Sequence, residues 1–325
     1  MKAGLKRTVK AFVLVMLVWC VAGATTEAQN RELDRIRRDS RSTSVRSVTI
    51  PLTLRLREPK SQTEIQSIEY LTVLEDGEEQ EILSLRGGIR SPLSLAILVQ
   101  DDSVSSVGNE ISGLAAFIRR LPPGSRVMIG YLRSGSLSVR QRFTTDLERA
   151  ARALRIPLSS SSAAPYNPYV ELVEALKRFE SQPVGRRALL LVSDGVDVSR
   201  GLDSSSPALS VDLARAINEA QRRSVAVYSI YAPTVGTTAG GQSQLVSNGQ
   251  GSLKRLSEET GGRAFFQGLS APVSFNPFLK EISNLLPRQF ALTYLSTHAG
   301  KGFHRIKVVA DVKDGEILYP SGYVR

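Results

Sequence analysis

The sequence contains almost no cysteine, tryptophan or histidine. Its single cysteine, Cys20, and single tryptophan, Trp19, lie within the first 28 of 325 residues. If those residues are removed, disulfide bonds and thiol chemistry are excluded, so stability has to come from a hydrophobic core. Only His298 and His304 offer an imidazole, and no Gly-x-Ser-x-Gly motif is present. We therefore predict that the protein is not an enzyme.

A long apolar run is also missing. The apolar stretch 11–21 falls short of the roughly 20 residues that a membrane-spanning helix needs. Basic residues precede this stretch, and the small residues Ala22-Gly23-Ala24 follow it, which is typical of a cleaved signal peptide. We predict a signal peptide over 1–28, no transmembrane span after cleavage, and export to the periplasm, the cell surface or the extracellular space.

Acidic residues are outnumbered by basic ones, with a formal charge of +11. Loss of the four basic residues in 1–28, together with Glu27, lowers this charge to +8. In an exported protein such a charge favours anionic surfaces or polymers as partners, and we predict no nucleic-acid binding. The arginine-rich segment 29–47 is expected to be a solvated basic linker, and an electrostatic anchor to membrane or wall is the alternative.

Both ends of the exported chain predict β-structure. Apolar residues alternate with polar ones from Ile50 to Leu56, the pattern of a half-buried strand. We define an N-terminal β segment, 48–88, and a C-terminal β segment, 287–325. Because neither segment has enough strands to bury a face alone, we predict that the two form one smaller, β-sandwich-like module. Two separate β appendages are the alternative.

The middle of the chain, 89–286, alternates apolar strands with helical patterns. This alternation predicts an α/β domain with a doubly wound, mostly parallel sheet. We expect a helix to open at Ser206-Pro207, with the serine as its N-cap and the proline in its first turn. The Gly-, Ser-, Thr- and Asn-rich stretch 235–252 is predicted to be a mobile loop, followed by a short helix over 253–260.

Oxygen-bearing side chains follow two of the apolar runs. Asp101, Ser103 and Ser105 come after the run 94–100, and Asp194 follows the run 189–193. In open α/β sheets ligands bind outside the carboxyl ends of the strands. These four residues are therefore the candidate binding site, and their oxygens are the donors that small divalent cations prefer.

Asp101-x-Ser103-x-Ser105 with the distant Leu-Val-Ser-Asp194-Gly195 resembles the von Willebrand factor A (VWA) domain family and its metal-ion-dependent adhesion site. With Glu75-Asp76-Gly77, Phe143-Thr144-Thr145-Asp146 and Gly322-Tyr323, the chain looks closest to the exported VWA-domain proteins of Acidobacteria. The resemblance covers most of the exported chain and implies a VWA/Rossmann-like fold. It also implies Mg²⁺ or Mn²⁺ at Asp101, Ser103, Ser105 and Asp194.

The sequence departs from the family at one ligand. In the family a threonine from another loop completes the metal site, whereas no threonine stands in 156–170 of this chain. The alternative without a metal is that Asp101 and Ser103 cap the turn after their strand, while Asp194 holds a loop through backbone N–H groups.

The functional hypothesis is an exported adhesion-type protein that binds a protein or an extracellular polymer at this site. An acidic side chain of the partner would fill the open position on the metal. A metal-free envelope scaffold is the first alternative, and a hydrolase is the second.

Overall fold

The computed structural model describes residues 46–57, 68–87, 91–165, 167–238, 243–268, 270, 272–312 and 315–325. The chain divides into two compact units, 1–46 with 297–299, and 47–296 with 300–325, and the architecture below is that of the second. The predicted signal peptide, 1–28, and the predicted linker up to residue 45 lie outside the described residues. No helix in the described ranges combines the length and the apolar character needed to cross a membrane.

A six-stranded sheet forms the centre of the α/β part, in the order β6-β5-β4-β7-β8-β9. All its neighbouring strands pair in parallel except β5 and β6, which are antiparallel. Taken in chain order, this is the 3-2-1-4-5-6 arrangement of a doubly wound sheet, so the predicted fold class is confirmed at this level. The strands are β4 (Leu93–Gln100), β5 (Arg126–Arg133), β6 (Ser136–Thr144), β7 (Arg186–Ser193), β8 (Ala226–Tyr231) and β9 (Ala264–Phe265).

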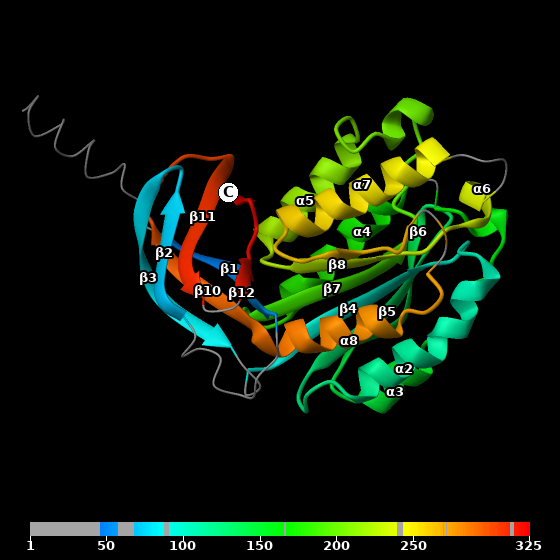
Figure 1. Cartoon of the computed structure of the whole chain (residues 1–325), viewed down its shortest axis with the longest axis horizontal. Helices are drawn as coiled ribbons and strands as arrows, with labels where there is room; N and C mark the ends of the chain where they lie inside the picture. Colours follow the sequence, from blue (N-terminus) through cyan, green and yellow to red (C-terminus); the bar gives the residue numbers. More distant parts are fainter. Residues whose placement is uncertain are drawn as a thin grey trace, which may run out of the picture. The chain divides into compact units, whose positions relative to one another are not determined.

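Helices cover both faces of this sheet (Figure 1). One apolar cluster joins one face to α2 (Ile111–Arg119), α3 (Leu147–Arg152) and α8 (Asn276–Leu285). A second cluster joins the other face to α4 (Pro168–Lys177), α5 (Val211–Arg222) and α7 (Ser243–Glu259). Every residue of β4 and β7 is buried, because helices lie on both sides of these central strands. The remaining helical turns are η2 (Ser105–Glu110), η3 (Ser161–Ala163), η4 (Arg178–Ser181), η5 (Leu202–Ser205), α6 (Val235–Thr238) and η6 (Leu286–Arg288).

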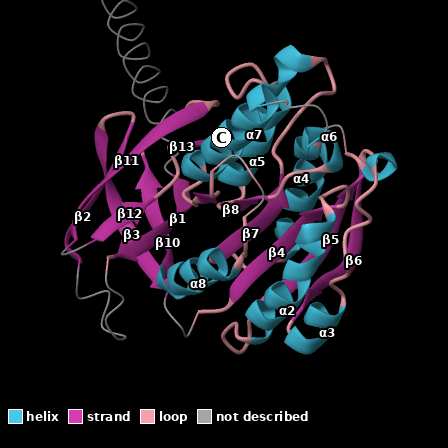
Figure 2. Cartoon of the chain, turned by 45° about the vertical axis from the view of Figure 1, so that its right-hand side comes forward, coloured by secondary structure: helices cyan, strands magenta, loops and turns pink. Residues whose placement is uncertain are grey.

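Strands from the two ends of the chain form one further sheet, in the order β12-β1-β10-β3-β2-β11-β13. Its hydrogen bonding is continuous because β10, from the C-terminal segment, lies between β1 and β3. The predicted joint module is therefore present, but as a single curled sheet around its own apolar cluster and not as two stacked sheets (Figure 2). The strands are β1 (Arg46–Leu56), β2 (Ile68–Glu75), β3 (Glu78–Gly87), β10 (Gln289–Ser296), β11 (Phe303–Val312), β12 (Gly315–Leu318) and β13 (Gly322–Val324).

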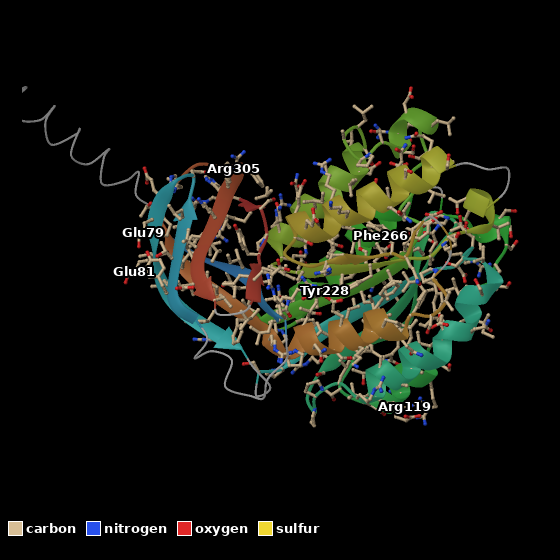
Figure 3. The ribbon with its side chains drawn as sticks, in the orientation of Figure 1. Glu79, Glu81, Arg119, Tyr228, Phe266 and Arg305 are labelled. Carbon is tan, nitrogen blue, oxygen red and sulfur yellow. The ribbon has the colours of Figure 1, made fainter. Side chains whose placement is uncertain are left out.

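The two sheets contact each other through buried polar groups. The hydroxyl of Tyr228, labelled in Figure 3, lies 3.3 Å from the hydroxyl of Thr53 on β1. The Gln289 side chain donates to the carbonyl oxygen of Arg187 at 3.1 Å. These bonds tie the curled sheet to the ends of β7 and β8 that lie away from Asp194.

Two predictions about local structure were wrong. The helix expected at Ser206-Pro207 begins at Val211, where the Ser210 hydroxyl accepts the N–H of Leu213 at 3.2 Å. The stretch predicted as a loop over 235–252 is mostly helical, because it contains α6 and most of α7. Two glycines of α7, Gly249 and Gly251, are sites of close packing: a Cβ on Gly249 would lie 2.1 Å from the Asp194 carbonyl oxygen. Tertiary packing thus overrides their low helix propensity.

Candidate functional site

The carboxyl ends of β4 and β7 lie side by side at the point where the strand order reverses. Val99 pairs with Val192, so Asp101 and Asp194 follow neighbouring strand ends. The side chain of Gln100 bridges the two ends: its carbonyl oxygen accepts the Ser193 hydroxyl and, at 3.3 Å, the Asp194 N–H. The structure thus brings the two predicted aspartates to one edge of the sheet.

Asp101 is fully buried and is bound by Arg155. The two terminal nitrogens of Arg155 each donate to one carboxylate oxygen of Asp101 at 2.7 Å. The Leu158 N–H adds a third hydrogen bond to Asp101 at 3.1 Å. This fork-to-fork geometry is among the strongest arrangements of a carboxylate and a guanidinium, and the Asp101 carboxylate raises the pKa of Arg155.

Tyr131 on β5 fixes Arg155 in this position. The tyrosine hydroxyl donates to the Arg155 carbonyl oxygen at 2.6 Å and accepts the Arg155 N–H at 2.7 Å. The guanidinium also lies over the Tyr131 ring, 4.2 Å from its centroid. Because backbone and side chain are both held, little rotamer entropy is left for Arg155 to lose when it pairs with Asp101.

Asp194 is also buried, but neutral donors surround it. One oxygen accepts the Val196 N–H at 3.0 Å, and the other accepts the Thr234 hydroxyl at 2.7 Å. Burial raises the pKa of Asp194 to about 7, although these two hydrogen bonds favour the charged form and oppose the rise. Asp194 therefore titrates near neutral pH.

The loops after β4 and β8 meet above the end of β7. Ser103 and Thr234 form an antiparallel bridge, the Val104 N–H donates to the Pro233 carbonyl at 3.0 Å, and the Val235 N–H donates to the Asp102 carbonyl at 3.1 Å. Because β7 lies between β4 and β8, this bridge covers Asp194. Asp101, Ser103 and Asp194 are all buried at this edge.

The two predicted serines differ in their surroundings. Ser103 is buried, and its hydroxyl donates to the Gln100 carbonyl at 2.7 Å. Ser105 begins η2, is exposed, and makes no side-chain hydrogen bond within the described ranges. The alternative without a metal predicted that such residues hold the turn and a loop. Two of its contacts are present: the Ser103 hydroxyl closes the turn after β4, and the Asp194 carboxylate accepts a loop N–H.

Two buried acidic oxygens near the site, one on Asp102 and one on Glu171, have no hydrogen-bond partner in the described part of the chain. Asp102 is almost fully buried, and its Oδ1 makes no hydrogen bond in the described part of the chain. Burial raises the pKa of Asp102, and the nearby charge of Asp101 adds to the rise. The carboxyl of Glu171 on α4 is buried as well, and burial raises its pKa to about 8. The carboxyl groups of Asp102 and Glu171 are thus shifted toward their neutral forms.

These contacts decide how well a divalent cation fits. Mg²⁺ needs oxygen ligands in a near-octahedral arrangement. Both oxygens of Asp101 already accept from a positively charged group, and both oxygens of Asp194 accept from donors. The arrangement therefore does not fit a metal unless Arg155 is displaced. Metal binding at Asp101, Ser103, Ser105 and Asp194 stays a prediction.

Two residues of the site were missed in the sequence. Thr234 follows a predicted strand by three residues, so the rule that selected Asp101 and Asp194 would also have found it. Arg155 carries no such signal, because it stands among other arginines after a helix. Arg155 directly precedes the loop 156–170, which lacks the threonine that the family resemblance leads one to expect. This missing threonine is the one sequence feature that suggests a positively charged group other than a metal ion at the site.

Of the two described histidines, His304 belongs to the curled sheet and not to the six-stranded sheet that carries this edge. His304 on β11 uses both ring nitrogens, one with a carboxylate oxygen of Asp76 at 2.8 Å and the other with the Gly300 carbonyl at 3.0 Å. Its ring also stacks on Tyr323, with centroids 5.2 Å apart. His304 is therefore held as a structural residue.

A scan against protein-family models and a search of curated proteins found no match. Similar solved structures include an aerotolerance-related membrane protein from Bacteroides fragilis, at 11% identity and TM-score 0.41, covering 60% of this chain and 98% of that one. BatB from Bacteroides thetaiotaomicron matches at 12% identity and TM-score 0.39, with 59% and 95% covered. The VWA domain of SpRpn10 matches at 11% identity and TM-score 0.34, with 57% and 97% covered. Values this low carry no conclusion about fold or function.

Proposed function

We propose that the chain is an exported, non-enzymatic binding protein with a VWA-like α/β domain. Its binding site lies at the carboxyl ends of β4 and β7, where Arg155 takes the place of a metal ion. The observation that carries this proposal is the paired hydrogen bonding of Arg155 to Asp101 at 2.7 Å. A guanidinium at this point supplies the positive charge that the family resemblance assigns to Mg²⁺ or Mn²⁺. The closer likeness to exported proteins of Acidobacteria stays a prediction.

Exposed apolar side chains beside the site support a protein partner. Leu202, Leu209 and Val211, which follow β7, are 69%, 66% and 63% exposed. The first two border a hollow of about 480 Å³ that α7 lines from the other side. Exposed apolar groups gathered at one place are a common mark of protein-binding surfaces. An envelope scaffold would use the same surface, and the bonding of Arg155 supports that alternative equally.

Addition of Mg²⁺ or Mn²⁺ tests the proposal. Millimolar amounts of either ion should leave the melting temperature of the wild type unchanged, because Asp101 is already compensated. Arg155→Met retains an unbranched side chain over Tyr131 but removes the guanidinium from both carboxylate oxygens of Asp101, and only the Leu158 N–H still donates to one of them. The same ions should therefore raise the melting temperature of this variant.

Titration of Mg²⁺ or Mn²⁺ into the wild type, followed by calorimetry, tests the proposal even if the variant does not fold. We expect no heat of metal binding. A metal-induced rise in the wild-type melting temperature that disappears in Asp101→Ala would overturn the proposal and restore the metal-dependent adhesion site. Arg152→Met, which changes an arginine that is 67% exposed, is the matched control and should behave as the wild type.

A further inference from the structure

A basic hollow lies at the free edge of the six-stranded sheet, away from Asp101 and Asp194. Its volume is about 440 Å³, within the range of roughly 300–1,000 Å³ that small-molecule sites occupy. β6 forms this edge, and Figure 2 shows it at one end of the sheet. The described residues that line the hollow are Leu137, Val139, Arg140, Gln141, Arg142, Arg149 and Arg178.

The four arginines come from three separate elements. Arg140 and Arg142 alternate along β6, Arg149 lies on α3, and Arg178 follows α4. α3 and α4 pack on opposite faces of the sheet, so the arginines that line the hollow come from elements on both faces as well as from the edge strand. Two contacts hold the elements that carry these arginines: the backbone N–H of Arg149 donates to Asp146 at the start of α3 at 2.8 Å, and the Phe143 ring of β6 packs edge-on against Phe179 at 5.0 Å.

Little negative charge balances these arginines. Among the described residues that line the hollow, none is acidic. Arg178 pairs with Glu174 at 3.0 Å, but its Nε is buried and has no hydrogen-bond partner within the described ranges. In contrast to Arg178, the side chains of Arg140, Arg142 and Arg149 make no ion pair within the described ranges. Like charges gathered in this way repel one another unless an anion lies between them.

We propose that this basic hollow is a binding site for clustered phosphate groups. The planar fork of arginine matches the oxygens of a phosphate and donates two hydrogen bonds to it. A single carboxylate would neutralise one of the four charges, whereas a polyvalent phosphate neutralises several at once. Leu137 and Val139 give the hollow an apolar wall, which lowers the local dielectric constant and strengthens each ionic contact.

The test uses triphosphate as a soluble probe and vesicles of phosphatidylglycerol as a surface probe. Titration calorimetry in low salt should show triphosphate binding to the wild type, and added NaCl should weaken it by screening. Arg140→Gln/Arg142→Gln removes two charge-assisted contacts and should weaken binding by at least about tenfold. Arg120→Gln/Arg215→Gln removes the same charge from exposed positions outside the hollow and should leave binding almost unchanged.

The vesicle arm identifies the source of the phosphate. Loss of both triphosphate and vesicle binding in Arg140→Gln/Arg142→Gln supports the site for either source. Loss of triphosphate binding alone supports a soluble phosphate ligand, and loss of vesicle binding alone supports a lipid headgroup.

Three results would overturn the proposal. The wild type could bind neither probe. Both double variants could lose binding equally, which would mean that net charge alone is responsible. The variant at the hollow could bind normally but aggregate, which would mean that the arginines only keep the edge strand from pairing with other chains.

Discussion

The ends of β4 and β7 carry the same residue type in two different electrostatic settings. Asp101, at the end of β4, is bound by the charged guanidinium of Arg155. Asp194, at the end of β7, is bound by a hydroxyl and a backbone N–H, both neutral. Both side chains are buried, and both residues directly follow the ends of adjacent strands. The comparison shows that a buried carboxylate is accommodated either by a fixed opposite charge or by a shift toward its neutral form.

The two settings have different consequences for stability. When a buried carboxylate has a charged partner, removal of that partner strongly destabilises the protein, because an uncompensated buried charge remains. A carboxylate with neutral donors instead makes stability depend on pH, because folding changes its proton affinity. The four predictions below test this difference, from the largest expected effect to the smallest.

Arg155→Met should have the largest effect. It removes the paired hydrogen bonds of Arg155 from buried Asp101 and leaves only Arg133, whose Nε lies 3.9 Å from the carboxylate, as a counter-charge. The free energy of unfolding should fall by about 3 kcal/mol. Urea denaturation at neutral pH measures this change. Asp101→Asn added to Arg155→Met should recover part of the loss, because the remaining group is neutral. A loss below about 1 kcal/mol would show that Arg155 is not the main compensating charge.

Asp194→Asn should change how stability depends on pH. The pKa of Asp194 is raised to about 7 in the folded protein, from 3.8 for the free side chain. Its contribution to stability is therefore complete below about pH 4 and is lost as the pH rises through about 7. Relative to the wild type, the variant should gain about 2.5 kcal/mol between pH 5 and pH 8.

The gain is measured by denaturation at several pH values. Asp203→Asn removes the same charge from an exposed position and controls for net charge. A constant difference between Asp194→Asn and the wild type across this range would contradict the assignment of a titrating carboxyl to the β7 end.

Gly249→Ala tests the close contact behind Asp194. The added Cβ would meet the Asp194 carbonyl oxygen at 2.1 Å, so α7 has to move away from the β7 end. The better helix propensity of alanine offsets part of the strain, and we expect a net loss of about 1–2 kcal/mol. Thermal melting measures the loss. The exposed Ser247→Ala, on the same helix, should change stability little, and equal effects of the two changes would contradict the packing explanation.

Ser103→Ala and Ser105→Ala should differ slightly. Ser103 loses a buried hydrogen bond to Gln100, which is worth about 1 kcal/mol. Ser105 is exposed and has no such bond, so its change should stay within about 0.5 kcal/mol. Equal losses in a denaturation experiment would indicate that both hydroxyls serve the same site, as in a metal-binding arrangement.

Much of the α/β part could be predicted from local patterns. Apolar runs such as 94–100 and 189–193 became β4 and β7, since a strand buried on both faces has to be continuously apolar. The first part of α7, 243–252, was missed because Gly249 and its polar neighbours have low intrinsic helix propensity, whereas the helix predicted over 253–260 matches its second part. Only the packing of that helix against Asp194 and Gly195 explains why glycine stands there.

The sequence by itself determined which residues end the central strands, because strand ends follow from apolar periodicity and chain order. It therefore located Asp101 and Asp194 and the edge of the sheet where they meet. Which group faces each carboxylate was decided only by the tertiary structure. Arg155 lies 54 positions from Asp101, and Thr234 lies 40 positions from Asp194. No local pattern encodes such pairings, since they depend on how loops cross the carboxyl ends of the sheet.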